Sequence, residues 1–433
     1  MASTRARSQL VKRLSSVVLV LGLVLTACAQ GSDPVSTARL TKASGVRFDD
    51  IGIDEVRGDV SVMVRQTTGL GANLIRDTES SDNKVVSPWG AMVALQMLRV
   101  GARGNTAAQL ESAIGAPGRD VHAALIGQLD RFDSDPGAVD ADNPPTPPVF
   151  HQATGLFIDE SVSVESGYLD ILGESFDTGV YPTDFSAADT EKAITDWLAV
   201  NTGGEISETP TDFSPETVIS LLSTVYLAAA WQQPFPATAT SPAEFTDSNG
   251  KVSDVNMMKQ TVSAGFLRGA GWTGLQLPYS DGFALQVFLP SEGNNVNGFL
   301  DPQRLTTAGT DLRSVPQSPV SVGLPRWDVT TNLDLKVALE KLGVRDLFTD
   351  AADLTGISPG LLVTAAAQDS TVTVGEKGTV AASATQIDAG VTAMPPAGQI
   401  PVFVADRPFV YQIIDTATGL PLFLGTIIQP GRV

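Results

Sequence analysis

The sequence predicts a single α+β domain over residues 55–433. Segments with a helical repeat of apolar residues are interleaved with runs of β-formers, so neither an all-α nor an all-β fold fits. Much of the strand signal lies late in the chain, and neither an internal repeat nor a convincing second linker divides this region. With 433 residues, of which 42% are hydrophobic and 18% charged, the chain can bury an extensive core.

Four helices are predicted from apolar residues at helical spacing between capping residues. The clearest starts at Ser87, a good N-cap followed by proline in the first turn, and stops at Gly101. Its apolar residues repeat at i, i+3, i+4 and i+7, which places one face of the helix in the core. The other three are expected over residues 105–114, around residues 194–198 and over residues 335–342.

Strands are predicted where apolar β-formers run between turn residues. The last two are joined by the turn-like sequence Thr416-Ala417-Thr418-Gly419, and a stretch rich in Asp, Gly and Pro over residues 133–148 indicates a long surface loop. The strands are expected over residues 284–289, 371–374, 402–404, 409–414 and 422–428.

The first 27 residues have the layout of a secretory signal. Four basic residues precede an apolar run over residues 17–25, which is too short for a comfortable transmembrane helix. We therefore expect residues 1–27 to be removed and to take no part in the fold.

Cys28, the only cysteine, ends a sequence that resembles the bacterial lipobox. In Leu25-Thr26-Ala27-Cys28, two small residues would let signal peptidase cut before a thiol that accepts a diacylglycerol. A plain signal with an incidental cysteine is the alternative, but a free thiol in an oxidising compartment is a liability. We expect an exported lipoprotein, held at the cell membrane through Cys28, with residues 28–54 as a flexible tether.

The chain is acidic, with a formal charge of -20 that becomes -24 when the signal and its four basic residues are removed. Such a surface is a poor partner for nucleic acids or other polyanions. One cysteine and two distant histidines offer no cluster of metal ligands, and no glycine-rich phosphate loop is present. We expect a monomer without a metal or cofactor.

Two patterns typical of serine catalysis occur, and neither fits its context. Gly356-Ile357-Ser358-Pro359-Gly360 matches G-x-S-x-G, but a proline and β-formers follow where that motif requires a helix. Both histidines precede this serine, against the order found in α/β-hydrolases. Ser81-Asp82-Asn83-Lys84 matches S-x-x-K but lies in a polar turn, where its lysine would stay charged. We expect no enzyme activity.

Residues 376–400 form a long segment, rich in small residues and without an obvious core face. An exposed alanine-rich loop or short helix is the plain interpretation. Read with the strand period of two, however, one face carries only small or apolar residues, while Gln386 and Asp388 fall on the other. Such a segment could enter a sheet without burying a charge, and Gly378 at its base could allow a large backbone reorientation. The small or apolar face comprises Thr379, Ala381, Ser383, Thr385, Ile387, Ala389 and Val391.

This segment and motifs along most of the chain resemble the serpin family. Glu376-Lys377-Gly378-Thr379, followed by Ala381-Ala382-Ser383-Ala384, closely resembles the hinge of inhibitory serpins. The resemblance implies a serpin domain with a large central sheet, two further sheets, about eight or nine helices and an exposed reactive-centre loop. Other motifs follow in the family's order, among them Val86-Ser87-Pro88, Gly101-Ala102-Arg103-Gly104-Asn105-Thr106, Trp231-Gln232-Gln233-Pro234-Phe235, Leu277-Pro278-Tyr279 and Phe423-Leu424-Gly425.

The resemblance implies a suicide-type inhibitor of serine proteases, with cysteine proteases as a second target class. A protease that cuts the loop would form an acyl-enzyme and be trapped when the cut loop inserts into the central sheet. Counting from the hinge glycine at the family's usual interval puts the cut at Thr392-Ala393, with Val391 or Met394 as alternatives for the residue before it. The small β-branched Thr392 suits an elastase-like or subtilisin-like protease better than a trypsin-like one.

The resemblance also implies residues that govern the opening of the sheet. At its top, Trp231, Arg326 and Glu376 match a tryptophan and a base–acid pair, with arginine where lysine is usual. In mid-sheet, Ser87 is retained, but other residues of the family's hydrogen-bond cluster are exchanged. Gly90, Ser223 and Gln368 stand where serine, asparagine and histidine are typical.

The exchanged mid-sheet cluster keeps a second interpretation open. It could ease sheet opening, or it could mark a non-inhibitory serpin that acts as a carrier, a chaperone or a protease substrate. A solute-binding lipoprotein is a remote alternative, because such a protein should show two lobes and no alanine-rich loop near its C-terminus.

Overall fold

The structure is a computed structural model that describes residues 37–76, 82–137, 143–206, 208–209, 213–293, 295–379 and 400–431. All of these residues belong to one compact unit of the chain. The signal segment, Cys28 and most of the expected reactive-centre loop lie outside them. Within the part that is described, no helix has the length and apolar character needed to cross a bilayer.

Helices and strands are interleaved along the chain, and the α+β class predicted from the sequence is confirmed. The described helices are α1 (Arg57–Arg76), α2 (Pro88–Gly101), α3 (Gly104–Ile114), α4 (Arg119–Asp130), α5 (Ser166–Phe176), α6 (Thr190–Asn201), α7 (Val296–Phe299), α8 (Pro302–Arg313) and α9 (Leu335–Lys341), with 3-10 turns η1 (Ala237–Ala239) and η2 (Asp346–Phe348). The described strands are β1 (Lys84–Val86), β3 (Val149–Asp159), β4 (Tyr181–Thr183), β5 (Ile219–Ala230), β6 (Ser241–Thr246), β7 (Val252–Gly269), β8 (Trp272–Pro278), β9 (Phe283–Pro290), β10 (Ser318–Pro325), β11 (Trp327–Asp334), β12 (Ala365–Val374), β13 (Gly378–Thr379), β14 (Val402–Val404), β15 (Phe409–Asp415) and β16 (Pro421–Ile427).

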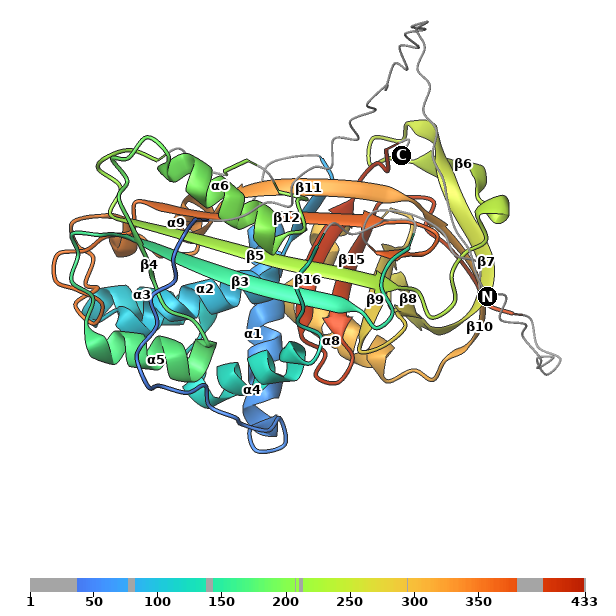
Figure 1. Cartoon of the computed structure of the whole chain (residues 1–433). Helices are drawn as coiled ribbons and strands as arrows, with labels where there is room; N and C mark the ends of the chain where they lie inside the picture. Colours follow the sequence, from blue (N-terminus) through green and yellow to red (C-terminus); the bar gives the residue numbers. More distant parts are fainter. Residues whose placement is uncertain are drawn as a thin grey trace, which may run out of the picture. The chain divides into compact units, whose positions relative to one another are not determined.

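The central sheet has six strands in the order β11-β12-β13-β5-β3-β4. Figure 1 shows α6 lying over one face of this sheet, with α2, α3, α4 and α5 on the other. Because both faces are covered, nearly every residue of β5 is buried, which explains its almost continuous apolar sequence.

The remaining strands form one nine-stranded sheet, in which β7 joins two parts. Residues 252–264 of β7 pair with β6 and β10, and its last five residues pair with β8. The two further sheets expected from the resemblance are therefore continuous through β7. Strand β14, which follows the loop, pairs in parallel with β10 at the edge.

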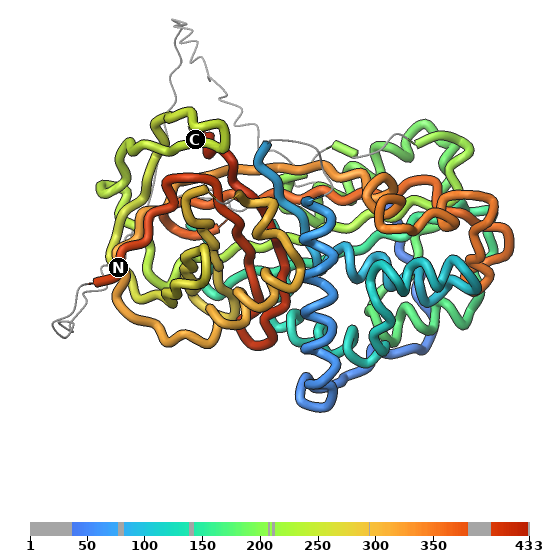
Figure 2. Tube along the Cα trace, turned by 180° about the vertical axis from the view of Figure 1, so that it is seen from behind, coloured from blue at the N-terminus to red at the C-terminus, as the bar shows by residue number. Residues whose placement is uncertain are grey.

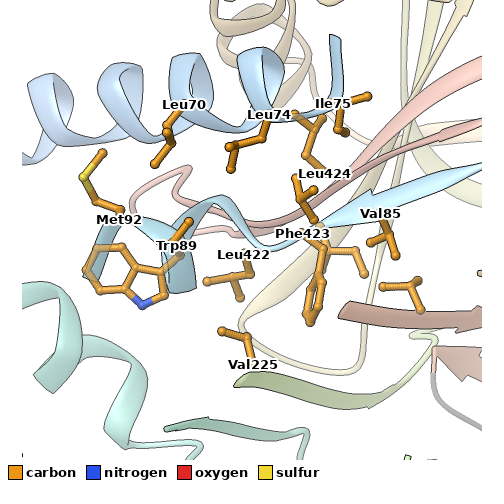
Figure 3. Packing of buried hydrophobic residues seen from close by; sticks show 14 of the residues in the cluster. Leu70, Leu74, Ile75, Val85, Trp89, Met92, Val225, Leu422, Phe423 and Leu424 are labelled. Atoms are coloured by element: carbon orange, nitrogen blue, oxygen red, sulfur yellow. The ribbon is translucent and has the colours of Figure 1, made fainter. Parts of the chain in front are cut away.

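Buried residues of α1, α2 and β16 pack into one hydrophobic core, which supports the central sheet. Leu70 and Leu74 of α1 face Trp89 of α2 and Leu424 of β16 (Figure 3). The two helices approach so closely that a Cβ on Gly71 would lie 2.4 Å from Cγ of Pro88. This close contact stabilises the N-terminal end of α2, where the mid-sheet residue Ser87 is placed.

The segment before α1 was expected to be part of a flexible tether. Its described part instead packs along the domain. Thr41 forms a backbone bridge with Val180, and the amide of Asp49 donates to the carbonyl of Glu174 at 2.9 Å. Lys42 binds the carboxylate of Asp177 at 2.8 Å. Figure 2 shows this blue segment running beside the helical side of the molecule before it enters α1. The described part, residues 37–56, is thus held by backbone and side-chain contacts.

Candidate functional site

The central sheet is split between β5 and β12. These two strands pair directly, in parallel, only where Ala365–Gln368 of β12 meets Ser220–Ser223 of β5. Toward the other end of the strands they separate, and the two residues of β13 lie between them. A parallel ladder that is open along half its length leaves backbone groups available to a further strand.

Strand β13 is wedged into the open end of this split. Gly378 and Thr379 pair with Ala230 and Ala229 of β5, and Thr379 also pairs with Val374 of β12. A Cβ on Gly378 would lie 2.1 Å from the carbonyl oxygen of Ala229, so only glycine fits here. The sequence indicated Gly378 as a point of backbone freedom. In the structure, its lack of a side chain allows the backbone to lie close to β5.

Below β13 the split is occupied by a hollow with about 430 Å³ of empty space, part of it open to solvent. The hollow is lined by residues of both separated strands, by residues of the segment after α6 and by Phe423 of β16. The lining residues include Val225 and Leu227 of β5, Val372 of β12, and Thr379 itself. The hollow therefore continues in the direction in which β13 points.

An ion pair holds the chain at the point where it enters the split. Arg326 binds the carboxylate of Glu376, and the hydroxyl of Thr240 donates to the same oxygen at 2.6 Å. Burial opposes ionisation of Glu376, but the hydrogen bonds from Arg326 and Thr240 outweigh it, so its pKa lies below the usual range. The pair expected from the sequence is thus present, with Thr240 as an additional partner.

Trp231 anchors the same turn through its indole and its backbone. Its Nε1 donates to the carbonyl of Gly375 at 2.8 Å, and its amide donates to the carbonyl of Lys377 at 2.8 Å. The indole stacks on Tyr279 with ring centroids 4.4 Å apart and planes 8° apart. The hydroxyl of Tyr279 is hydrogen-bonded to Oγ1 of Thr379, so tryptophan and tyrosine together clamp the hinge.

The mid-sheet residues form two groups. Gln368 and Ser87 exchange two hydrogen bonds of 2.9 Å, which tie β12 to the start of α2. The Ser87 hydroxyl donates to the carbonyl of Leu422 at 2.7 Å and accepts from the amide of Gly90, as its predicted N-cap role requires. Oγ of Ser223 is buried and has no hydrogen-bond partner among the described residues. Ser223 of β5 therefore adds no side-chain hydrogen bond to this cluster in the part of the chain that is described.

Several residues expected in the site fall in a range that the structure does not describe. Ala381, Ala382, Ser383, Ala384, Thr392 and Ala393 lie outside the described residues. Ser358 lies in a turn, without the strand-to-helix connection of a catalytic elbow. In the described ranges, no three His, Cys, Asp or Glu residues are grouped so that they could hold a metal ion.

Thr240 and Tyr279 were not expected as site residues. Tyr279 lies in a motif that the resemblance matched, but neither a tyrosine after a strand nor a threonine after a short 3-10 turn carries a local signal for a role at the hinge. The turn after β12 brings Glu376 to the hydroxyl of Thr240, and β13 brings Thr379 to the hydroxyl of Tyr279.

Comparison with known proteins identifies one family. The model described as "Serpin (serine protease inhibitor)" matches residues 65–430. The chain is 28% identical to a serine proteinase inhibitor of Cavia porcellus, over 83% of this chain and 86% of that protein. It is 30% identical to the leukocyte elastase inhibitor of Bos taurus, over 80% and 93%. A native-state crystal structure of the thermophilic serpin tengpin matches with a TM-score of 0.75 at 23% identity, over 90% of this chain and 99% of that one.

Proposed function

Because the chain belongs to the serpin family, we propose that it inhibits serine proteases by trapping the acyl-enzyme when its cleaved loop inserts between β5 and β12. The observation that carries this proposal is the split itself, with β13 already paired to both of its edges. A cut in the loop would free the chain that follows Thr379 to extend β13 as a full strand.

β13 sets the register that an inserted loop would adopt. Thr379 pairs antiparallel with β12 on one side and with β5 on the other. Each further residue of the loop would lie one residue further back along both strands. In this register Thr385 would separate Gln368 from Ser223, which now face each other across the direct β5–β12 pairing.

The side chains of the loop suit this register. Thr379 is 2% exposed, and residues that follow it at a period of two would share its buried face. These residues are small or apolar as far as Val391, whereas the charged Asp388 falls on the other face. Insertion would add two ladders of hydrogen bonds and fill the hollow without burying a charge on that face.

We place the reactive bond at Thr392-Ala393, with Val391 or Met394 as alternatives for the residue before the cut. A small β-branched residue favours a protease with a shallow apolar pocket, either elastase-like or subtilisin-like. The relative from Bos taurus is named a leukocyte elastase inhibitor, in agreement with this preference.

We also propose that the protein is an exported, monomeric lipoprotein anchored through Cys28. A diacylglycerol on Cys28 would hold the domain at the outer side of the cytoplasmic membrane. The mass of the N-terminal peptide tests the anchor: a diacylated Cys28 supports it, and an unmodified mature N-terminus contradicts it.

The experiment is to incubate the purified chain with an elastase-like and a subtilisin-like protease, followed by a denaturing gel and mass spectrometry. We expect a covalent complex and a released peptide that starts at Ala393. If the released peptide starts at another residue, the reactive bond lies directly before that residue instead.

Thr379→Arg is the matched variant, because a charged side chain at the first buried position should stop insertion. It should be cut at the same bond without forming a complex. If the unaltered protein is also cut without a complex, the non-inhibitory alternative replaces the inhibitory one.

A further inference from the structure

His151 of β3 lies between two elements that are distant from each other in sequence. Its Nδ1 is 2.7 Å from Oδ1 of Asp133, in the segment after α4, and its Nε2 is 2.9 Å from Oδ1 of Asn201, the last residue of α6. Nδ2 of Asn201 donates to the carbonyl of Trp197 in α6 at 2.7 Å, so the oxygen of this amide is the atom that faces His151. Both atoms that contact the imidazole are therefore acceptors.

This arrangement fits the doubly protonated form of His151. A carboxylate and an amide oxygen only accept hydrogen bonds, whereas a neutral imidazole carries one N–H and an imidazolium carries two. A neutral His151 would keep its N–H toward the charged Asp133, because that hydrogen bond is the stronger one. The contact with Asn201 therefore depends on the second proton.

The surroundings of His151 favour this proton. Burial opposes protonation, but the hydrogen bonds and the charges of Asp133 and Asp135 outweigh it, so the pKa of His151 lies above its usual 6.5. Tyr226 lies opposite on β5, and burial raises its pKa, so that it stays uncharged. Burial also raises the pKa of Glu205, in the segment after α6. The side chain of His151 is 20% exposed, which allows it to exchange its proton with water.

The contact with Asn201 connects His151 to the split. Figure 1 shows α6 over the central sheet, and Thr202, Glu205 and Ile206, which follow α6, line the hollow in the split. A strand that enters the hollow passes along these residues, and movement of the end of α6 gives it room. A hydrogen bond that holds this end of α6 on β3 opposes that movement.

We propose that protonated His151 is a positioning residue that holds the end of α6 on β3 and thereby slows insertion of the loop into the split. The hydrogen bond to Asn201 is complete below pH 6.5 and is lost as the pH rises through the raised pKa of His151. Insertion is therefore slower in mild acid than in alkaline solution. The hold on α6 is a property of the uncut chain alone, whereas the effect on insertion rests on the proposed function.

Hydrogen exchange of residues 190–206 in the purified, uncut chain tests the hold on α6 without a protease. His151→Leu removes both hydrogen bonds, and comparison with it at each pH cancels the intrinsic effect of pH on exchange. We expect the unaltered chain to be protected about threefold to tenfold more than this variant at about pH 5.5, and equally at about pH 9. Equal protection at both values would overturn the proposal.

Asp133→Asn separates the titration of His151 from a purely structural role. This variant removes the charge that favours the proton, so the pKa of His151 falls and the protection of α6 should be lost at a lower pH than in the unaltered chain. Asp196→Asn, which removes an exposed ion pair with Lys192 elsewhere on α6, is the matched control and should keep the pH profile of the unaltered chain. An unshifted profile in Asp133→Asn would overturn the assignment to His151.

The rate of complex formation with a protease tests the effect on insertion. Dividing the rate of His151→Leu by that of the unaltered chain at each pH cancels the pH dependence of the protease and of other groups, Asp369 among them. We expect a ratio of about threefold or more at about pH 6 that approaches one at about pH 9. A constant ratio would overturn the effect on insertion. If no complex forms at any pH, the proposed function and this effect fail together, and the hold of His151 on α6 stands on the exchange data.

Discussion

Oγ1 of Thr379 is hydrogen-bonded to the hydroxyl of Tyr279, inside the open end of the split between β5 and β12. Tyr279 stacks in turn on Trp231, whose indole holds the carbonyl of Gly375. The start of the hinge is therefore already part of the central sheet while the chain is uncut. Its contacts determine how readily the rest of the loop can follow.

Gly378→Ala should displace β13. The added Cβ would meet the backbone of β5 at 2.1 Å, and a backbone carbonyl cannot turn aside as a flexible side chain can. We expect a loss of about 1–3 kcal/mol of stability and weaker protease trapping. Gly375→Ala is the matched control, because a Cβ there meets no atom within 4 Å. Thermal unfolding and complex yield should change for Gly378→Ala alone; equal effects would contradict the close approach.

Glu376→Gln should weaken the contact that holds the chain where it enters the split. The variant removes the charge that pairs with Arg326, whose side chain is 34% exposed, so water compensates only in part. We expect the loss of about 1–2 kcal/mol and a faster conversion to forms with an inserted, uncut loop. Asp406→Asn removes a more exposed partner, from Arg407, and should cost less than about 0.5 kcal/mol. Native gels after mild heating would show the difference.

Thr385→Val should lower the stability of the cut form and leave the uncut form unchanged. The inserted register places Thr385 beside Ser223, whose hydroxyl has no partner among the residues described for the uncut chain. We expect a loss of about 1 kcal/mol after cleavage only. Ser223→Ala should be neutral or stabilising before cleavage and destabilising after it. A Thr385→Val effect of equal size in both forms would contradict this register.

The buried His122 should make the protein sensitive to acid. Burial lowers its pKa to about 4, from 6.5, so the unfolded chain binds a proton more readily than the folded one. Its contribution to stability is complete above pH 6.5 and is lost as the pH falls to 4, by up to about 3 kcal/mol. His122→Phe, whose ring would pack against Trp89 and Phe176, should flatten the melting temperature across this range. An unchanged pH profile would contradict the assignment.

Asp369, which lies on β12 at the edge of the split, should give stability the opposite dependence on pH. Burial raises its pKa to about 7, from 3.8, so the folded chain keeps a proton that the unfolded chain has released. Stability is therefore lost as the pH rises from about 4 to 7. Asp369→Asn should raise the melting temperature at pH 8 and have little effect at pH 4. A variant that is equally stabilised at both values would indicate packing instead of ionisation.

The sequence predicts those elements whose signals are local. Ser87 caps α2 as expected, and strands β9, β15 and β16 lie close to the predicted ranges. Helix α1 and strand β7 were missed. In α1, polar residues and glycines interrupt the apolar repeat, and the helix is held by its packing on α2 and α8. In β7, exposed and buried residues alternate irregularly because its two halves pair with different partners.

The residues of the candidate site also fall into two groups: some were identified from the sequence, and others are shown only by the structure. Arg326 and Glu376 were identified by resemblance, and their ion pair is present. The absence of a partner for Ser223 within the described residues could not be read from the sequence, because it depends on how β5 and β12 are aligned. The packing of residues 37–56 was also missed, since a polar segment of mixed composition gives no signal for the bridge from Thr41 to Val180.

Thermal unfolding of the protein before and after a single cut in the reactive-centre loop tests the central claim most directly. If the split accepts the loop, the cut form gains two ladders of hydrogen bonds and should melt at a markedly higher temperature, with Thr379→Arg lacking most of this gain. If the cut and uncut forms melt at the same temperature, the loop does not insert and the trapping mechanism is contradicted.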